Sequence, residues 1–212
     1  KITDAAFTHI LSYIKPGVAE RDVALELEYF MRKNGADGIA FDTICVSGKK
    51  SSLPHGVPDE TVIDKGFVTM DFGAKFGGYC SDMTRTVCVG KPDEDMANVY
   101  NTVAEAQKRA LDVIRADVVG SEVDAAARDF IYENGYEGCF GHSTGHSLGI
   151  EIHENPNFSP SCKTKIPEGA VLSVEPGIYI NGKYGVRIED IVVITADGCK
   201  NLTESEKHLI IL

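Results

Sequence analysis

The segment FVTMDFGAKFGGYCSDMTRTVCV, residues 67–89, carries the pattern that decides the fold. β-Branched and aromatic residues on both sides of Gly77-Gly78 predict a β-hairpin. Aspartate is disfavoured inside strands, yet Asp71 and Asp82 each lie within one arm. If the loop spans residues 75–78, Asp71 lies directly opposite Asp82, with Cβ atoms about 4.5–5.5 Å apart. Two buried carboxylates that close repel unless a proton or a cation separates them; the alternative is two solvent-facing acids on an exposed sheet.

A second hairpin is predicted near the end of the chain, with strands over residues 170–180 and 185–194. Side chains alternate between the two faces of a strand, so the length of the connecting loop decides which residues share a face. A two-residue Asn-Gly loop would send Glu175 and Glu189 to different faces. For both to reach one site, the loop must hold an odd number of residues or a bulge must intervene, and we predict one of these.

Three of the chain's six histidines fall within the segment FGHSTGHSLGIEIHE, residues 140–154: His142, His146 and His153. Imidazole is the usual side chain for proton transfer near neutral pH and a common metal ligand. Because the interleaved glycines disfavour a helix, we predict a loop that enters a strand at about residues 146–152, with His153 at the end of that strand. His55 lies in another loop, where two prolines and a glycine would help to aim its ring.

Apolar residues at helical spacing predict four helices, over residues 2–14, 20–33, 93–116 and 121–133. Further strands are predicted over residues 39–47 and near residues 208–211. Helices with one apolar face and hairpins that need cover indicate an α+β fold, in which the helices pack on the sheets. No linker or low-complexity segment interrupts the chain, and we expect residues 1–212 to form a single domain.

The composition is typical of a soluble globular protein, with 43% hydrophobic and 25% charged residues. No apolar run approaches the roughly 20 residues that a membrane span needs, and no secretory signal is visible. A net charge of −11 disfavours a nucleic-acid partner, which would require a basic patch. The six cysteines include no Cys-x-x-Cys pair, which favours reduced thiols in a cytoplasmic protein over disulfides or a zinc-thiolate site.

Five side chains from distant parts of the chain form a candidate metal site: Asp71, Asp82, His146, Glu175 and Glu189. Four carboxylates and one imidazole are a hard, oxygen-rich donor set. Their negative charge is too large for one zinc ion but suits two divalent ions that share carboxylates, and manganese, iron, cobalt and zinc all fit such donors. Two ions about 3.5–4 Å apart recur in aminopeptidases and phosphatases. The histidines outside this set would be free to stabilise an oxyanion or to move protons.

Seven short motifs, in this order along the chain, resemble those of the catalytic domain of proline-specific metallopeptidases, the Xaa-Pro aminopeptidase and Xaa-Pro dipeptidase (prolidase) family. They are LPHG (53–56), MDFG (70–73), SDMTRT (81–86), GHSTGH (141–146), EIHE (151–154), VEPGIY (174–179) and VRIED (186–190). Each motif alone is weak, but together they span nearly the whole chain. Ser143 and Ser147 stand where many relatives have glycine. The resemblance implies a pita-bread fold, a curved and mostly antiparallel sheet covered by helices, with internal pseudo-two-fold symmetry.

The resemblance also implies what the metal site does. The five candidate donors would ligate two divalent ions, with Mn2+ as the first expectation and Co2+, Zn2+ or Fe2+ as alternatives. Asp82 and Glu189 would bridge the two ions, and Glu175 would also shuttle a proton. Arg187 would support Glu189 from outside the ligand set.

The implied substrates are small peptides with proline at the second position, cut by an exopeptidase that binds the free amine beside Asp71. His55 and His153 would bind the substrate and stabilise the tetrahedral intermediate, and His142 would line the substrate site. A bond that precedes proline has no N–H, so an enzyme for it needs a dedicated pocket. Members of this family usually carry an additional N-terminal domain, which we expect to be missing from this chain and which commonly helps to form a homodimer.

Two other functions remain open. Methionine aminopeptidases share the five-ligand pattern, although residues 174–179 and 186–190, and the position of His142 before His146, resemble the proline-specific branch more closely. Some pita-bread domains are non-catalytic peptide-binding modules, but these typically lose metal ligands, and none is lost here. The intact donor set also argues against the creatine-hydrolysing relatives of this fold.

Overall fold

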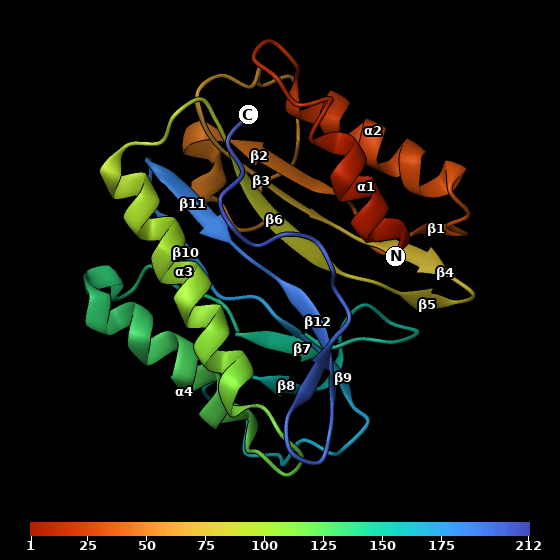
Figure 1. Ribbon diagram of the computed structural model, residues 1–212, viewed down its shortest axis with the longest axis vertical. Coiled ribbons are helices and arrows are strands. Elements are labelled where there is room, and N and C mark those ends of the chain that lie inside the picture. Colours follow the sequence, from red (N-terminus) through yellow and green to blue (C-terminus); the bar gives the residue numbers. More distant parts are fainter.

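Two long β-hairpins, one in each half of the chain, form the centre of the computed structural model, which describes residues 1–212 (Figure 1). A short break divides each hairpin into two antiparallel strand pairs. The first half contains β3 (Gly66–Phe72) with β6 (Met83–Val89), and β4 (Ala74–Phe76) with β5 (Tyr79–Cys80). The second half contains β9 (Val171–Val174) with β12 (Asp190–Ile194), and β10 (Gly177–Ile180) with β11 (Tyr184–Arg187). Both predicted hairpins are therefore present.

The register of the first hairpin differs from the predicted register by two residues. The loop consists of Gly77-Gly78 alone, and Asp71 faces Thr84 rather than Asp82. Both loop glycines have positive φ angles, 58° and 85°, as a two-residue type I′ turn requires. The predicted four-residue loop is wrong because a glycine pair can close a tighter turn. A shift of two residues preserves the alternation of faces, and both aspartates line the same cavity.

The second hairpin has a loop of the predicted kind. It closes through three residues, 181–183, as the pairing of its outer strands requires. The inner strands keep the same register as the outer ones, and no bulge separates them. Glu175 and Glu189 therefore lie level with each other at the break between the two strand pairs. The predicted odd-numbered loop is confirmed.

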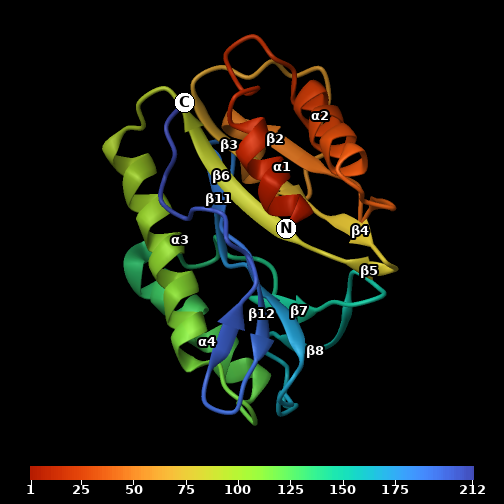
Figure 2. The same ribbon diagram turned by 45° about the vertical axis from the view of Figure 1, so that its right-hand side comes forward.

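Four helices cover the hairpins: α1 (Ile2–Ile10), α2 (Glu20–Lys33), α3 (Glu94–Val113) and α4 (Gly120–Ile131). The first two lie beside the first hairpin and the other two beside the second (Figures 1 and 2). All four predicted helices are present, and α1, α3 and α4 end earlier than predicted. The buried apolar side chains form two clusters, one under each helix pair, and Phe67 and Cys88 of the first hairpin join the second cluster. The two halves thus share a packed boundary.

The same contacts recur where the chain enters α2 and α4. Isolated bridges join Ala19 to Val62 before α2, and Val119 to Lys165 before α4. In each half, the residue after the bridge donates its N–H to the residue directly before the bridge partner. The two halves therefore have the same arrangement of helices, hairpin and bridged segment, as the predicted pseudo-two-fold symmetry requires.

The remaining elements are short: β1 (Gly38–Ile39), β2 (Ile44–Ser47), β7 (Gly145–Ser147), β8 (Glu154–Phe158), β13 (Cys199–Asn201), the 3-10 helix η1 (Gly48–Ser52) and the π-helical turn η2 (Tyr132–Tyr136). They complete sheets of order β2-β3-β6, β1-β4-β5 and β13-β12-β9-β7-β8. The strand predicted over residues 39–47 is interrupted at residues 40–43. The strand predicted near residues 208–211 is reduced to one bridge between Ile211 and Cys88.

The strand predicted over residues 146–152 is largely absent. β7 ends at Ser147, and residues 148–153 form a bend before β8. The Glu154 carboxylate accepts the N–H of Glu151 at 3.0 Å, and this local hydrogen bond takes the place of ladder pairing. His153 therefore lies directly before β8 rather than at the end of a strand.

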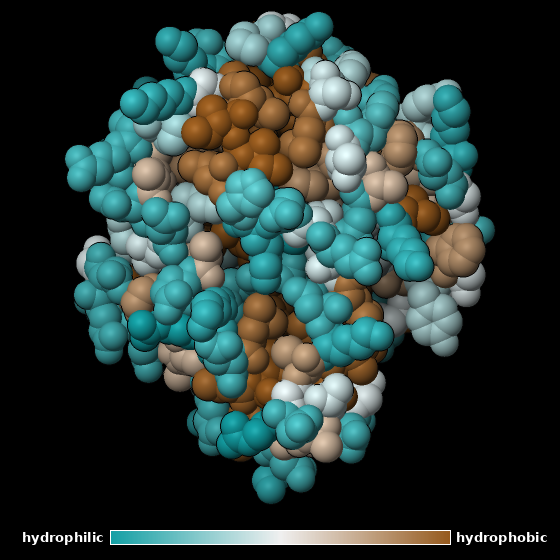
Figure 3. All heavy atoms as spheres, viewed as in Figure 1, coloured by the Kyte–Doolittle hydropathy of each residue, from teal (hydrophilic) through white to brown (hydrophobic).

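Hydrophilic side chains cover most of the face seen in Figure 3, in keeping with the net charge of −11. Two hydrophobic areas interrupt this face, one of them near the C-terminal end of the chain. None of the helices is both long and apolar enough to cross a membrane. All six cysteines are free, but only Cys45 and Cys88 are buried.

Candidate metal centre

Side chains from both halves line a cavity of about 300 Å³. Its polar wall contains these residues, among them all four predicted site histidines: His55, Asp71, Asp82, His142, Ser143, His146, His153, Asn157, Glu175 and Arg187. Phe41, Ile44 and Ile152 add a small apolar area. A concave site of this kind, with several convergent titratable groups, has the character of an active site.

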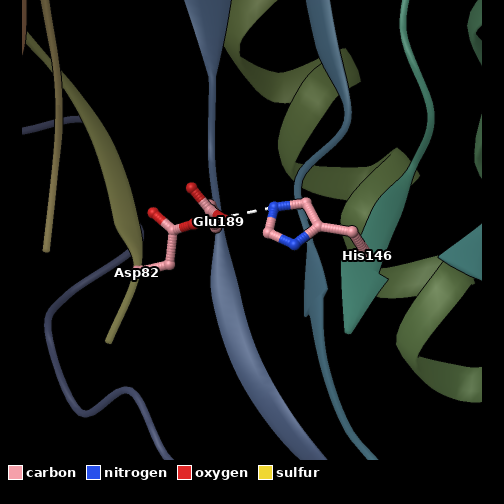
Figure 4. Close-up of side chains that lie close together, drawn as sticks. All are labelled: Asp82, His146 and Glu189. Carbon is pink, nitrogen blue, oxygen red and sulfur yellow. Dashed lines mark ion pairs between the residues drawn. The ribbon is translucent and has the colours of Figure 1, made fainter. Parts of the chain in front are cut away.

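Asp82, His146 and Glu189 form the centre of the site (Figure 4). Each offers one donor atom, and the three atoms lie within 4.8 Å of one another. Asp82 comes from just before β6, His146 from β7, and Glu189 from the break between β11 and β12. Both carboxylates are buried. Side chains from distant parts of the chain thus converge on one point.

Asp71 and Glu175 extend this group to the five predicted donors. Glu175 Oε1 lies 3.2 Å from His146 Nε2 and accepts a hydrogen bond from the Ser173 hydroxyl at 2.9 Å. Asp71 lies on β3 and lines the same cavity, where Arg187 holds its Oδ2 at 2.7 Å. The structure therefore brings all five side chains together.

His146 presents a nitrogen lone pair to the carboxylates. Its Nδ1 lies 3.1 Å from the Ser147 carbonyl oxygen and therefore donates the ring proton there. In the neutral ring, Nε2 then faces Oδ2 of Asp82 at 3.6 Å and Oε1 of Glu175 at 3.2 Å. Burial lowers the pKa of His146, but the hydrogen bond and charge of Glu175 outweigh it and raise the pKa. A cation or a proton is needed between these groups.

Three buried carboxylate oxygens have no hydrogen-bond partner: Oδ1 of Asp71, Oδ1 of Asp82 and Oε1 of Glu189. Buried polar atoms are normally satisfied, and buried charges are normally paired. Burial and then the neighbouring carboxylates raise the pKa of Asp82 and of Glu189 well above the ordinary range. Divalent cations would satisfy all three oxygens and offset the repulsion, so the residues present fit a dinuclear site.

The other two carboxylates differ in their ionisation. Burial raises the pKa of Asp71, although the Arg187 charge opposes this shift. Burial also acts to raise the pKa of Glu175, but the hydrogen bond with His146 and the charges of His142 and His146 outweigh it, so the pKa is lowered. The pKa of Glu175 is therefore shifted in the opposite direction to the pKa values of the other three carboxylates of the site.

Arg187 reaches two carboxylates, one of them indirectly. Its Nη2 donates to Asp71 at 2.7 Å, and its Nε donates to the Thr84 hydroxyl at 3.0 Å. That hydroxyl in turn donates to Oε2 of Glu189 at 2.7 Å. The predicted support of Glu189 by Arg187 thus passes through Thr84, a residue that the sequence analysis missed. Its position within the SDMTRT motif, two residues after Asp82, is the only signal in the sequence.

The three remaining histidines lie around the same cavity. The His142 Nδ1 donates to the Ser143 carbonyl oxygen at 2.9 Å, so its Nε2 accepts the Tyr179 hydroxyl at 2.8 Å. Burial lowers the pKa of His142, which favours the neutral ring. The His153 ring packs edge-on against the His146 ring, 4.4 Å between centroids, and burial followed by the His146 charge lowers the pKa of His153. Tyr179 is a further site residue that the sequence analysis missed.

The chain belongs to a family of metal-dependent peptidases: residues 1–196 match Metallopeptidase family M24. Among its relatives, the uncharacterized peptidase YqhT of Bacillus subtilis is 51% identical over 213 residues, which cover 100% of this chain and 60% of that protein. The Xaa-Pro dipeptidase of Pyrococcus furiosus is 46% identical over 211 residues, which cover 99% of this chain and 61% of that protein.

Solved structures of similar proteins support the same family assignment. An Xaa-Pro dipeptidase from Bacillus anthracis superposes with a TM-score of 0.98 and 54% identity, over 100% of this chain and 60% of that one. An X-Pro aminopeptidase from Thermotoga maritima gives 0.97 and 44%, over 100% of this chain and 60% of that one. These matches confirm the predicted α+β, pita-bread fold. The chain spans about 60% of the length of these relatives.

Proposed function

We propose that residues 1–212 form the catalytic domain of a dinuclear metal-dependent exopeptidase that removes an N-terminal residue preceding proline, as an Xaa-Pro aminopeptidase or an Xaa-Pro dipeptidase. The observation that carries this proposal is the set of three buried, unpartnered carboxylate oxygens at a site where Asp82, His146 and Glu189 offer donor atoms within 4.8 Å of one another. The names of relatives that are 44–54% identical to this chain support the preference for proline.

Five side chains would hold the two ions: Asp71, Asp82, His146, Glu175 and Glu189. Mn2+ is the first candidate for this oxygen-rich set, and Co2+, Zn2+ and Fe2+ are alternatives. When bound, the ions supply Lewis acidity for hydrolysis. As the resemblance implies, Asp82 and Glu189 would be shared between the two ions; both are buried at the centre of the group, and each has an oxygen free of hydrogen bonds.

The residues around the donors would bind the substrate and take part in its hydrolysis. His153 and His55 both line the cavity, and a ring N–H of each can donate a hydrogen bond to the oxyanion that forms at the scissile carbonyl. Glu175, whose pKa is lowered, would accept a proton as an ionised carboxylate and pass it to the leaving amine. His142 would form part of the substrate wall, with its ring held by Tyr179.

The free amine of the substrate would bind beside Asp71, which restricts cleavage to the first residue. Proline at the second position removes the N–H of the scissile bond, so the site must grip the peptide by its amine and its proline ring. Phe41, Ile44 and Ile152 supply the apolar surface of the cavity. We further place the protein in the cytoplasm, on the basis of its free cysteines, and expect homodimers of the whole protein.

Cleavage of the dipeptide Ala-Pro and of two tripeptides tests the proposal. With Mn2+ or Co2+ present, the protein should release Ala from Ala-Pro or from Ala-Pro-Ala and leave Met-Ala-Ser intact. Release of Met from Met-Ala-Ser alone would refute the proline assignment in favour of a methionine aminopeptidase. Protein that stays inactive on all three peptides with either added metal would instead favour a non-catalytic peptide-binding module.

A further inference from the structure

An ion pair on α4 holds the loop that carries His142 and leads into β7, where His146 lies. Asp124 and Arg128 lie one helical turn apart, and Arg128 Nε and Nη2 donate to the two carboxylate oxygens at 2.7 and 2.9 Å. Their side chains are only 1% and 14% exposed, so the pair is largely removed from water. Neither residue lines the cavity.

Arg128 holds this loop at two carbonyl groups. Its Nη1 donates to the Phe140 carbonyl oxygen at 2.8 Å, and its Nη2 donates to the His142 carbonyl oxygen at 2.7 Å. The guanidinium also lies over the Phe140 ring, 4.2 Å from the centroid. Because the guanidinium is a rigid planar fork, these contacts fix the backbone on both sides of Gly141. The backbone of His142 is therefore anchored by α4.

Asp124 holds the same loop two residues further along. Its Oδ1 accepts both the N–H of Thr144 at 3.1 Å and the Thr144 hydroxyl at 2.9 Å. Thr144 is fully buried and lies two residues before His146. Its carbonyl oxygen accepts the N–H of Glu175 at 2.7 Å. Asp124 thus holds Thr144, which is hydrogen-bonded to one donor of the proposed metal site, Glu175, and lies two residues from another, His146.

The first half of the chain contains an equivalent contact. Glu20 of α2 accepts the N–H and the hydroxyl of Ser47 at 2.6 and 2.9 Å and pairs with Lys50 at 2.7 Å. A helix carboxylate, a buried Ser or Thr and a basic partner therefore occur together in both halves. A buried ion pair contributes little net stability because its charges lose their hydration. Its main effect is therefore to orient the groups to which it hydrogen-bonds.

We propose that Asp124 and Arg128 are positioning residues with separate effects. Asp124 sets the affinity for metal through Thr144, and Arg128 sets the affinity for substrate through the backbone of His142. This inference rests on the proposed function, because both effects are measured on the metal-dependent peptidase.

The test compares Asp124→Asn and Arg128→Lys with the unmodified protein, by calorimetric titration with Mn2+ and by KM and kcat for Ala-Pro-Ala. The amide introduced by Asp124→Asn removes the negative charge and sets an N–H against either a guanidinium donor or the donors of Thr144, so we expect Mn2+ affinity to fall about 10- to 100-fold. The ammonium introduced by Arg128→Lys keeps the charge but cannot bond the carboxylate and both carbonyls in one plane. We expect the KM of this variant to rise about tenfold, with Mn2+ affinity within about twofold of the unmodified protein.

Arg109 on α3 provides a matched control. It also pairs with an acid one turn away, Glu105 at 3.1 Å, and stacks on an aromatic ring, Phe130 at 3.8 Å from the centroid. Its side chain makes no hydrogen bond to the loop at residues 140–144. Arg109→Lys should therefore leave both the Mn2+ affinity and the KM unchanged.

Unchanged Mn2+ affinity and KM in both α4 variants, with only a lower melting temperature, would overturn the inference, because a purely structural ion pair predicts that result. If Asp124→Asn fails to fold, Thr144→Val removes only the hydroxyl contact and Thr144→Ser retains it. Equal Mn2+ affinity in these two variants would also overturn the inference. An unmodified protein that binds no divalent metal would refute the proposed function itself.

Discussion

Replacing Thr84 by valine should uncouple Arg187 from Glu189. Valine matches threonine in shape but lacks the hydroxyl that accepts from Arg187 Nε at 3.0 Å and donates to Glu189 Oε2 at 2.7 Å. Two buried charged groups then each lose one hydrogen bond, which should lower the free energy of unfolding by about 2–3 kcal/mol. For a chain of this length, that corresponds to a fall in melting temperature of about 4–12 °C. Because Glu189 also loses the contact that orients it, Mn2+ affinity should fall about 10- to 100-fold.

A Thr86→Val variant distinguishes the effect of a less stable fold from the effect of a Glu189 side chain that is no longer oriented. Thr86 lies two residues further along β6, is also buried, and bonds the backbone of Arg187 at 3.0 and 3.2 Å, without touching a proposed metal ligand. Its replacement should destabilise the fold to a similar degree and leave Mn2+ affinity unchanged. Calorimetric Mn2+ titration and thermal unfolding of both variants give the comparison. Equal Mn2+ affinities for Thr84→Val and Thr86→Val would refute the role of Thr84.

Three further changes have defined outcomes. Asp82→Ala should abolish hydrolysis of Ala-Pro-Ala while the circular dichroism spectrum stays folded, and retained full activity would contradict the two-metal scheme. Because the pKa values of Asp82 and Glu189 are raised in the folded state, these two carboxyl groups bind more protons in the metal-free folded protein than in the unfolded chain, from about pH 4 up to their raised pKa values. Their contribution to the free energy of unfolding, measured with urea in EDTA, should therefore fall as the pH rises through that window, and Mn2+ should suppress this part of the pH dependence. The same slope with and without Mn2+ would argue against a cation at these carboxylates. Gly145→Ala places a Cβ 1.9 Å from the Ser173 carbonyl oxygen and should unfold the protein at lower temperature, whereas Gly141→Ala meets nothing within 4 Å; equal melting temperatures would contradict this packing.

The sequence was most informative where the alternation of side chains along a strand decides which residues share a face. Glu175 and Glu189 can share a site only if their hairpin loop is odd-numbered or a bulge intervenes, and the three-residue loop at 181–183 meets the first condition. The register of the first hairpin was not decidable in the same way, because both a four-residue and a two-residue loop place Asp71 and Asp82 on one face. Only the positive φ angles of Gly77-Gly78 select the shorter loop.

Contacts between the two halves of the chain could not be predicted from the sequence. Thr84 matters because its hydroxyl meets Glu189, which lies 105 residues away, and no local pattern encodes that distance. Tyr179 likewise gains its role from simultaneous contact with His142 and Arg187. The bend before β8 escaped prediction because a single side-chain hydrogen bond from Glu151 to Glu154 competes with strand pairing. The donors themselves were predictable because their residue types are costly to bury without a cation.

The amount of metal that the protein binds tests the dinuclear centre most directly. The protein is loaded with Mn2+, desalted and analysed by inductively coupled plasma mass spectrometry, alongside Asp82→Ala. Five converging donors with three unpartnered oxygens predict two Mn2+ ions per chain in the unmodified protein and a clear loss in the variant. A chain that retains no Mn2+, or that retains the same amount after Asp82 is removed, would contradict the dinuclear centre.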